Sequence, residues 1–152
     1  MANAFYIFKI MLTARRPSHT AHMRAVSIPF WLREGYDALT FFGTIITNSK
    51  QELSHSVKYH ESIHLHQAQS THNSWICFYW KYMIFWFQAR RANRILPNAG
   101  YLLNPFEMEA YANMYNPHYL ECFADGKATG WREYAKMTLA QRYWARRKYS
   151  RR

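Results

Sequence analysis

The residues of this chain that are best suited to chemistry form the pattern H-E-x-x-H, with His60, Glu61 and His64. Residues four apart lie on the same face of a helix, so both imidazoles can bind one zinc ion. Glu61 then lies beside the position of a zinc-activated water and can act as its general base. The spacing predicts a zinc site with two histidine ligands and a catalytic glutamate.

A third ligand is expected further along the chain, because a catalytic zinc site usually has three protein ligands and a water. The next carboxylates after the motif are Glu107 and Glu109. They lie in a predicted helix that begins with Asn104 as cap and Pro105 as first residue. Residues two apart point to different sides of a helix, so only one can be the ligand. If it is not a ligand, Glu107 is expected to be a capping residue, and Glu109 a solvated carboxylate.

The motif itself requires a helix, and the flanking residues predict one over 49–72. Ser49 and Glu52 match a capping box, which is typical of a helix N-terminus. Leu53 and Val57 precede the two histidines at helical spacing on one stripe. Because the histidines continue an apolar stripe, we expect the metal site to face the interior.

The elements around this helix predict a mainly helical α+β fold. Upstream, β-branched and aromatic residues indicate two short strands, over 26–32 and 39–47, with a turn at 34–37 between them. Downstream, the most apolar run of the chain, residues 75–87, predicts an aromatic helix. A strand pair, the motif helix, the aromatic helix and the helix of the third ligand therefore follow one another.

Residues 75–87 have two interpretations. As a helix they span about 20 Å, which is less than a bilayer requires. They form a core helix that packs against the motif helix, or an interfacial helix that contacts a membrane. In the second case Arg90, Arg91 and Arg94, which follow the run, contact lipid headgroups.

The chain is strongly basic, with 20 Lys and Arg against 9 Asp and Glu and a net charge of +11. This balance indicates an anionic partner or, alternatively, a solvated basic surface. Cys77 and Cys122 are the only cysteines, and their spacing indicates neither a disulfide scaffold nor a cysteine-based zinc site. Residues 1–12 are apolar but lack the flanking pattern of a signal peptide, so no signal peptide is expected.

The C-terminal residues carry much of this charge. Residues 1–130 are expected to form a single domain, and 131–152 an amphipathic helix with a basic tail. Cations interleaved with Tyr and Trp can follow a phosphate backbone and stack on bases, whereas the alternative is a solvated tail. The residues expected to contact nucleic acid or another anionic surface are Arg142, Arg146, Arg147, Lys148, Arg151 and Arg152.

The H-E-x-x-H helix, followed across an aromatic helix by E-x-E-A, resembles the gluzincin branch of zinc metallopeptidases. In that family a downstream E-x-x-A-D or E-x-x-A-N segment supplies the third ligand. The resemblance implies Glu107 as ligand, with Ala110 three residues on and Tyr111 where the family has Asp or Asn. The alternative register uses Glu109, with Asn113 as its polar partner.

A wider resemblance covers roughly residues 38–136. The strand pair, YHESIHLHQ, the aromatic helix and NPFEMEAYAN together resemble small zincin-like proteins of bacteria and their phages. This resemblance implies a minimal zincin-like fold and a cytoplasmic or virion-associated protein.

Two functions follow as expectations. The first is a zinc metallopeptidase that hydrolyses peptide or protein substrates, with Tyr111 or His118 as the donor to the oxyanion. The second is a non-catalytic structural component of a phage or nucleoprotein assembly. Such a component keeps the zincin-like scaffold and binds an anionic partner through its basic surface.

Overall fold

The computed structural model of this chain describes residues 24–28, 38–47, 53–123 and 127–149. Several sequence predictions lie outside these residues. They concern the apolar segment 1–12, the turn at 34–37, the capping box of Ser49 and Glu52, and the basic residues Arg151 and Arg152.

The strands form one three-stranded sheet. They are β1 (Arg24–Ser27), β2 (Ala38–Phe41) and β3 (Thr44–Thr47). The strand order is β1-β3-β2, with β3 parallel to β1 and antiparallel to β2. The sheet therefore places β2 at an edge, beside the helix that carries the H-E-x-x-H motif.

The prediction of one strand over 39–47 was wrong, because this segment is a β-hairpin. Phe42 and Gly43 form its turn with φ angles of 47° and 79°, the left-handed values that tight hairpins require. Glycine adopts such a value readily, whereas phenylalanine does so at a cost. The Phe42 N–H donates to the Tyr79 hydroxyl at 3.0 Å, which ties the turn to the aromatic helix.

Helices make up most of the described chain, so the prediction of a mainly helical α+β fold is confirmed. The α-helices are α2 (His55–Ser70), α3 (Trp75–Ala89), α4 (Ala99–Leu102), α5 (Pro105–Asn113), α6 (Trp131–Lys136) and α7 (Leu139–Tyr149). Two 3₁₀-helices, η1 (Arg90–Ala92) and η2 (Tyr119–Cys122), connect them.

Side-chain caps set the starts of the two helices that matter most for the site. Helix α2 begins at His55, later than predicted, because the Ser54 hydroxyl accepts a hydrogen bond from the Val57 N–H. The predicted start of α5 is confirmed, with the Asn104 side chain accepting from the Phe106 N–H and proline at the first position. Each cap satisfies a backbone donor that has no partner within the helix.

The predicted helix over 131–152 is divided into α6 and α7. Thr138 separates the two, because its hydroxyl accepts from the Gln141 N–H at 3.3 Å while its own N–H donates to the Gln141 amide oxygen at 2.8 Å. This reciprocal pair is a capping box that starts a new helix. Trp131, the first residue of α6, lies in the protein core.

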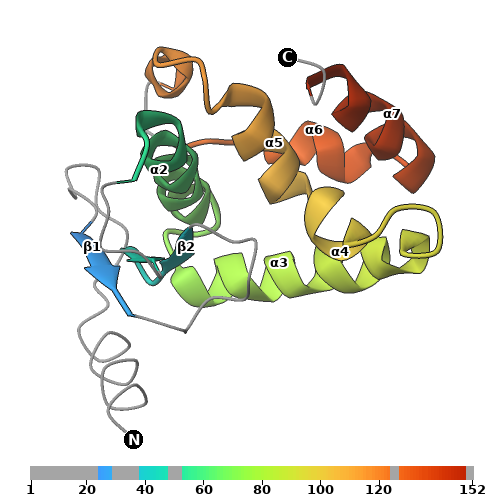
Figure 1. Ribbon diagram of the computed structural model, residues 1–152, viewed down its shortest axis with the longest axis horizontal. Coiled ribbons are helices and arrows are strands. Elements are labelled where there is room, and N and C mark those ends of the chain that lie inside the picture. The colour runs from blue at the N-terminus through green and yellow to red at the C-terminus, as the bar shows by residue number, and fades with distance from the viewer. Residues whose placement is uncertain (1–23, 29–37, 48–52, 124–126, 150–152) are drawn as a thin grey trace, which may run out of the picture.

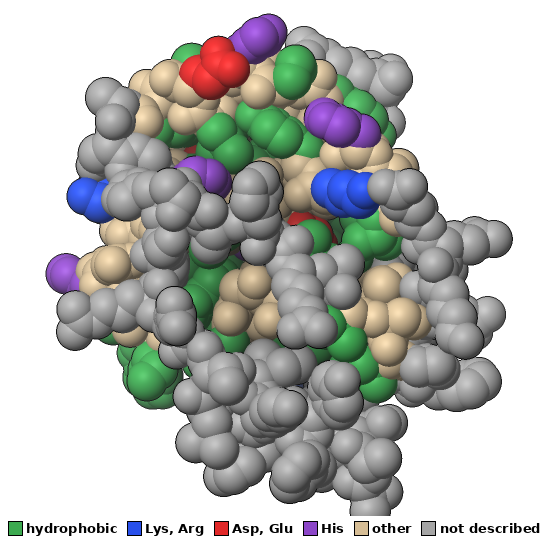
Figure 2. Space-filling view, turned by 90° about the vertical axis from the view of Figure 1, so that its left-hand side faces the viewer, with side chains coloured by type: hydrophobic (Ala, Val, Ile, Leu, Met, Phe, Trp, Pro, Cys, Tyr) green, Lys and Arg blue, Asp and Glu red, His purple; other side chains and the backbone are tan. Residues whose placement is uncertain are grey.

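Helix α3 runs along one side of the molecule, with the sheet and α2 near its N-terminal end and α4 near its C-terminal end (Figure 1). On the face shown in Figure 2, described acidic side chains are sparse, and hydrophobic and histidine side chains are prominent. Within the described part of the chain, every helix is too short or too polar to cross a bilayer.

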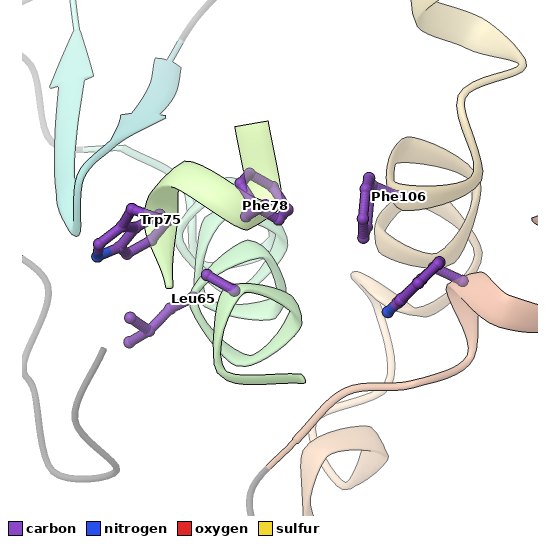
Figure 3. Close-up of a cluster of buried hydrophobic side chains, with 6 residues drawn as sticks. Leu65, Trp75, Phe78 and Phe106 are labelled. Atoms are coloured by element: carbon purple, nitrogen blue, oxygen red, sulfur yellow. The ribbon is translucent and has the colours of Figure 1, made fainter. Parts of the chain in front are cut away.

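The largest aromatic cluster joins the helices that position the site. Leu65 of α2, Trp75 and Phe78 of α3, Phe106 of α5 and Trp131 of α6 are buried together. Figure 3 shows Phe78 and Phe106 between their helices, with ring centroids 4.8 Å apart. This packing holds α2 and α5 at a fixed separation, which determines the distance between the histidines and the glutamates.

Candidate metal centre

Three ligand-bearing side chains converge between α2 and α5. His60 Nε2 lies 3.1 Å from His64 Nε2 and 3.3 Å from Glu107 Oε2, and His64 Nε2 lies 3.5 Å from Glu107 Oε1. With one atom from each residue, all three ligand atoms lie within 4.8 Å of one another. A tetrahedral zinc ion with bonds of about 2.0–2.1 Å separates its ligand atoms by about 3.3 Å. The spacing therefore fits a single metal ion.

Hydrogen bonding in this cluster also favours a cation. The cluster is buried, and Glu107 Oε2 has no hydrogen-bond partner among the described residues although His60 lies nearby. Two imidazole nitrogens facing each other at 3.1 Å satisfy each other only if one of them carries a proton. A buried carboxylate oxygen without a hydrogen bond is costly, and a metal ion supplies the missing partner. The set of two nitrogens and one oxygen suits zinc.

Without metal, the cluster behaves as a buried ion pair. Burial lowers the pKa of His64, but the Glu107 carboxylate outweighs burial and raises it to about 9. Burial likewise acts to raise the pKa of Glu107, yet the neighbouring imidazoles, His64 above all and then His60, hold it well below its usual range. A proton on His64 therefore occupies the position of the metal at neutral pH.

Glu61 lies beside this cluster and is held by the sheet. The Thr40 hydroxyl of β2 donates to Glu61 Oε2, and both side chains are buried. The Tyr79 hydroxyl of α3 donates to the Thr40 carbonyl at 3.0 Å, which fixes the end of β2. A neutral donor thus orients the carboxylate of Glu61. The second lone pair of Oε2 and the lone pairs of Oε1 can still accept a hydrogen bond from a ligand.

The cluster opens onto a cavity of about 230 Å³. Helix α2 contributes His60, Glu61 and His64 to its wall, and Glu107 comes from α5. The rest of the wall is mainly apolar and aromatic, consisting of Ala38, Leu39, Thr40, Phe78, Tyr79, Tyr82, Met83 and Tyr101. Pockets for drug-sized ligands measure about 300–1,000 Å³, so this cavity is smaller than they are. It suits a group comparable to one amino-acid side chain.

Tyrosines surround the carboxylate of Glu107. The Tyr82 hydroxyl donates to Glu107 Oε1 at 2.8 Å, and the Tyr101 hydroxyl lies 3.0 Å from that of Tyr111. Burial, followed by the charge of Glu107, raises the pKa of Tyr101, so its hydroxyl stays protonated. Of this pair, only Tyr101 lines the cavity, whereas the Tyr111 ring packs against His60 at 4.6 Å.

His118 was predicted as an alternative oxyanion donor, and the structure places it elsewhere. It precedes η2, is exposed, and pairs with Glu121 at 2.9 Å. It does not belong to the residues that line the cavity. The reason is that α5 ends at Asn113 and the residues that follow, 115–118, are exposed.

Glu109, the alternative third ligand, forms a separate buried network. Its Oε1 accepts from the Tyr119 hydroxyl at 2.6 Å and from the Gly130 N–H at 2.7 Å, and its Oε2 accepts from Gln67 Nε2 at 2.7 Å. Gln67 Oε1 in turn lies 2.7 Å from His64 Nδ1. Because an amide oxygen only accepts, His64 donates from Nδ1, and its Nε2, which faces Glu107, is left to bind a metal or, without one, a proton. Glu109 thus acts on the cluster through Gln67.

The basic C-terminal residues divide into buried and accessible ones. Arg142 is 4% exposed and donates to the carbonyls of Tyr134, Ala135 and Leu103, so it joins α7 to α6 and α4. Its predicted role with an anionic partner is corrected accordingly, because three backbone carbonyls occupy the guanidinium. Arg146 is half-buried, while Arg147 and Lys148 are exposed.

The sequence did not predict three residues of the site. Thr40, Tyr82 and Tyr101 come from β2, α3 and α4, and each belongs to an ordinary apolar or aromatic run. Nothing in their spacing relates them to the H-E-x-x-H motif. Gln67, by contrast, lies one turn after His64, so helical spacing alone places it beside the motif.

Comparisons of this chain with protein-family models, with curated proteins and with solved structures find no significant match. The resemblance to gluzincins and to small zincin-like proteins therefore stays a prediction. What the geometry provides is a buried group of His60, His64 and Glu107 that can hold a metal ion.

Proposed function

We propose that this protein is a zinc-dependent hydrolase that cleaves peptide bonds. The observation that carries the proposal is the position of Glu61, whose side chain lines the same cavity as His60, His64 and Glu107. A structural zinc site is closed by four protein ligands and has no need of a further carboxylate. Here three ligands meet at the wall of a cavity, as in sites that keep one position for water or substrate.

A bound zinc ion supplies Lewis acidity, which lowers the pKa of water to about 7 and polarises a carbonyl oxygen. Glu61 takes the proton of the attacking water and delivers it to the leaving amine. Thr40 keeps the Glu61 carboxylate aimed at the cavity through its hydroxyl donor. Tyr101, whose hydroxyl stays protonated, donates to the oxygen that becomes negative as the carbonyl is attacked.

The first experiment measures zinc per chain in the wild type, His64→Ala and His118→Ala. We expect one zinc in the wild type and in His118→Ala, and loss of zinc in His64→Ala. His118 is the matched control, because it is an exposed histidine away from the cavity. Equal zinc in all three proteins would contradict the metal centre.

The second experiment measures hydrolysis of a peptide library by the wild type and Glu61→Gln. We expect Glu61→Gln to keep zinc and to lose about 10²–10⁴-fold in turnover, the usual contribution of a general base. The control is Glu133→Gln, an exposed glutamate of α6. Zinc binding with no Glu61-dependent turnover would instead support a non-catalytic role for the scaffold.

A further inference from the structure

Helix α3 exposes a continuous apolar band. Its members are large, follow one another at helical spacing, and lie within an arc of about 100°. They are Ile76 (75% exposed), Trp80 (70%), Met83 (43%), Ile84 (39%) and Phe87 (56%). Within α3 this arc carries no charge, since Lys81 lies outside it, against Trp131. Singly exposed hydrophobic residues are ordinary, but five on one helix face form an interaction surface.

Cations extend the band at the C-terminal end of α3. Arg90, Arg91 and Arg94 are exposed, and Ile95 beside them is 77% exposed. Arg90 stacks on Trp86 with its guanidinium 4.8 Å from the ring centroid. No described carboxylate pairs with Arg91 or Arg94. The surface therefore combines a row of apolar side chains with arginines whose charge remains available.

The charge and the side chains of this surface argue against two kinds of partner, a second copy of the chain and a nucleic acid. Of the carboxylates that the structure describes, only Glu121 and Glu133 are exposed, and each already has a partner, His118 Nδ1 for Glu121 and Lys136 for Glu133. A second copy of a chain of net charge +11 brings like charge to the arginines. A nucleic acid is a poorer match than a lipid surface, because three of the five band residues, Ile76, Met83 and Ile84, are not aromatic and offer no stacking surface for bases.

We propose that the exposed face of α3 docks on an anionic lipid bilayer. The apolar band enters the boundary between headgroups and acyl chains, and the arginines contact the anionic headgroups. Helix α3 has 15 residues and lies in the plane of the surface, consistent with its being too short to span. The opposite side of α3, with Trp75, Phe78 and Ala89 buried, stays packed on the protein.

Docking has a consequence for the metal centre. Met83 belongs both to the exposed band and to the wall of the metal cavity. Leu39 of β2, which is 42% exposed, lines the same cavity. The mouth of the cavity thus lies at the docked surface, and the substrates of the enzyme are peptide segments at the membrane surface. This last consequence rests on the proposed function, whereas bilayer docking does not.

The test is co-sedimentation of the full chain with phosphatidylcholine vesicles, with and without phosphatidylglycerol. We expect binding to the mixed vesicles that weakens as salt rises, and little binding to phosphatidylcholine alone. Replacing Trp80 and Phe87 together by Gln removes two aromatic anchors and should lower binding about tenfold or more. Arg91→Gln with Arg94→Gln should lower it about fivefold per residue.

Two controls match these variants on other helices. Trp144→Gln on α7 removes an indole that is 61% exposed, and Arg132→Gln with Lys136→Gln on α6 removes the same charge. Both should bind vesicles as the wild type does. If the control variants lose binding and the α3 variants keep it, the proposal is overturned. A dimer in solution that the Trp80 and Phe87 variant dissociates would assign the band to a second copy and also overturn it.

A second variant keeps the test decisive if the Trp80 and Phe87 variant does not fold. If the Trp80 and Phe87 variant fails to fold, Ile76→Gln alters the most exposed member of the band on its own. Unchanged vesicle binding by folded Ile76→Gln and by the Arg91 and Arg94 variant would reject bilayer docking. Zinc content and peptide hydrolysis are measured separately, so loss of the proposed enzymatic function leaves the docking result unaffected.

Discussion

Helices α2 and α3 follow one another along the chain and are nearly equal in length, but they differ in which side chains they bury. Helix α2 buries eight of its 16 residues, among them His60, Glu61, His64, Gln67 and Gln69. Helix α3 is far more apolar and buries three of 15, Trp75, Phe78 and Ala89. Polar side chains inside and large apolar ones outside both cost free energy, so each inversion indicates a function. For α2 the buried group can hold a metal ion, and for α3 we propose an interaction surface.

The largest expected effect tests the buried side of α3. Phe78 is 3% exposed and contacts the rings of Trp75 and Phe106. Phe78→Ala leaves a cavity between α2, α3 and α5, and we expect a loss of about 3–5 kcal/mol in the free energy of unfolding. Urea unfolding measures it. A loss below about 1 kcal/mol would mean that α3 does not contribute to the core.

A smaller effect tests the polar interior of α2. Gln67→Met removes the amide that joins His64 to Glu109, while keeping the size of the side chain. We expect the zinc dissociation constant to rise about 10–100-fold, as for other partners of a metal-bound histidine. Competition with a chromophoric chelator measures it. Gln88→Met, an exposed glutamine of α3, is the control and should leave zinc affinity unchanged.

Zinc binding should also depend on pH, because the metal and the proton compete for His64. The pKa of His64 is raised to about 9 in the metal-free protein, so this residue is protonated at neutral pH. Binding releases that proton, and the affinity should rise about tenfold per pH unit between pH 6 and 8 and level off above about 9. Affinity that stays constant over this range would contradict the assignment of His64 as a ligand.

The smallest effect tests the exposed side of α3. Trp80 is 70% exposed, so Trp80→Ala should change the free energy of unfolding by less than about 0.5 kcal/mol. The comparison with Phe78→Ala, two residues earlier, then shows how sharply the two faces of one helix differ. A loss comparable to that of Phe78→Ala would show that Trp80 is a structural residue, not part of a docking surface.

Local patterns in the sequence predicted much of the helical framework. Asn104 and Pro105 predict the start of α5, and the spacing of His60 and His64 predicts that both lie on one face of α2. Such signals depend on side chains a few residues apart, which the helix brings together by itself. They failed where two local signals competed. Ser54 capped α2 in place of the predicted start, and the hairpin turn combines Gly43 with Phe42, which is not a typical turn residue.

The choice between Glu107 and Glu109 shows what local patterns leave open. Both are buried on α5, and both have a motif register that suits a ligand. The fold separates them, because Tyr119, Gly130 and Gln67 already occupy the carboxylate of Glu109. Arg142 illustrates the same point, since a basic sequence pattern suggested an exposed cation and the packing of α7 buried it.

The sequence by itself determined that His60 and His64 share a helix face, that Glu61 stands between them, and that the fold is mainly helical with a small sheet. These are properties of short stretches with fixed periodicity. Only the tertiary structure decided that Glu107 meets the histidines, that Thr40 holds Glu61, and that one face of α3 remains exposed. Those outcomes depend on the packing of segments far apart in the chain, where burial and unsatisfied polar groups select one arrangement.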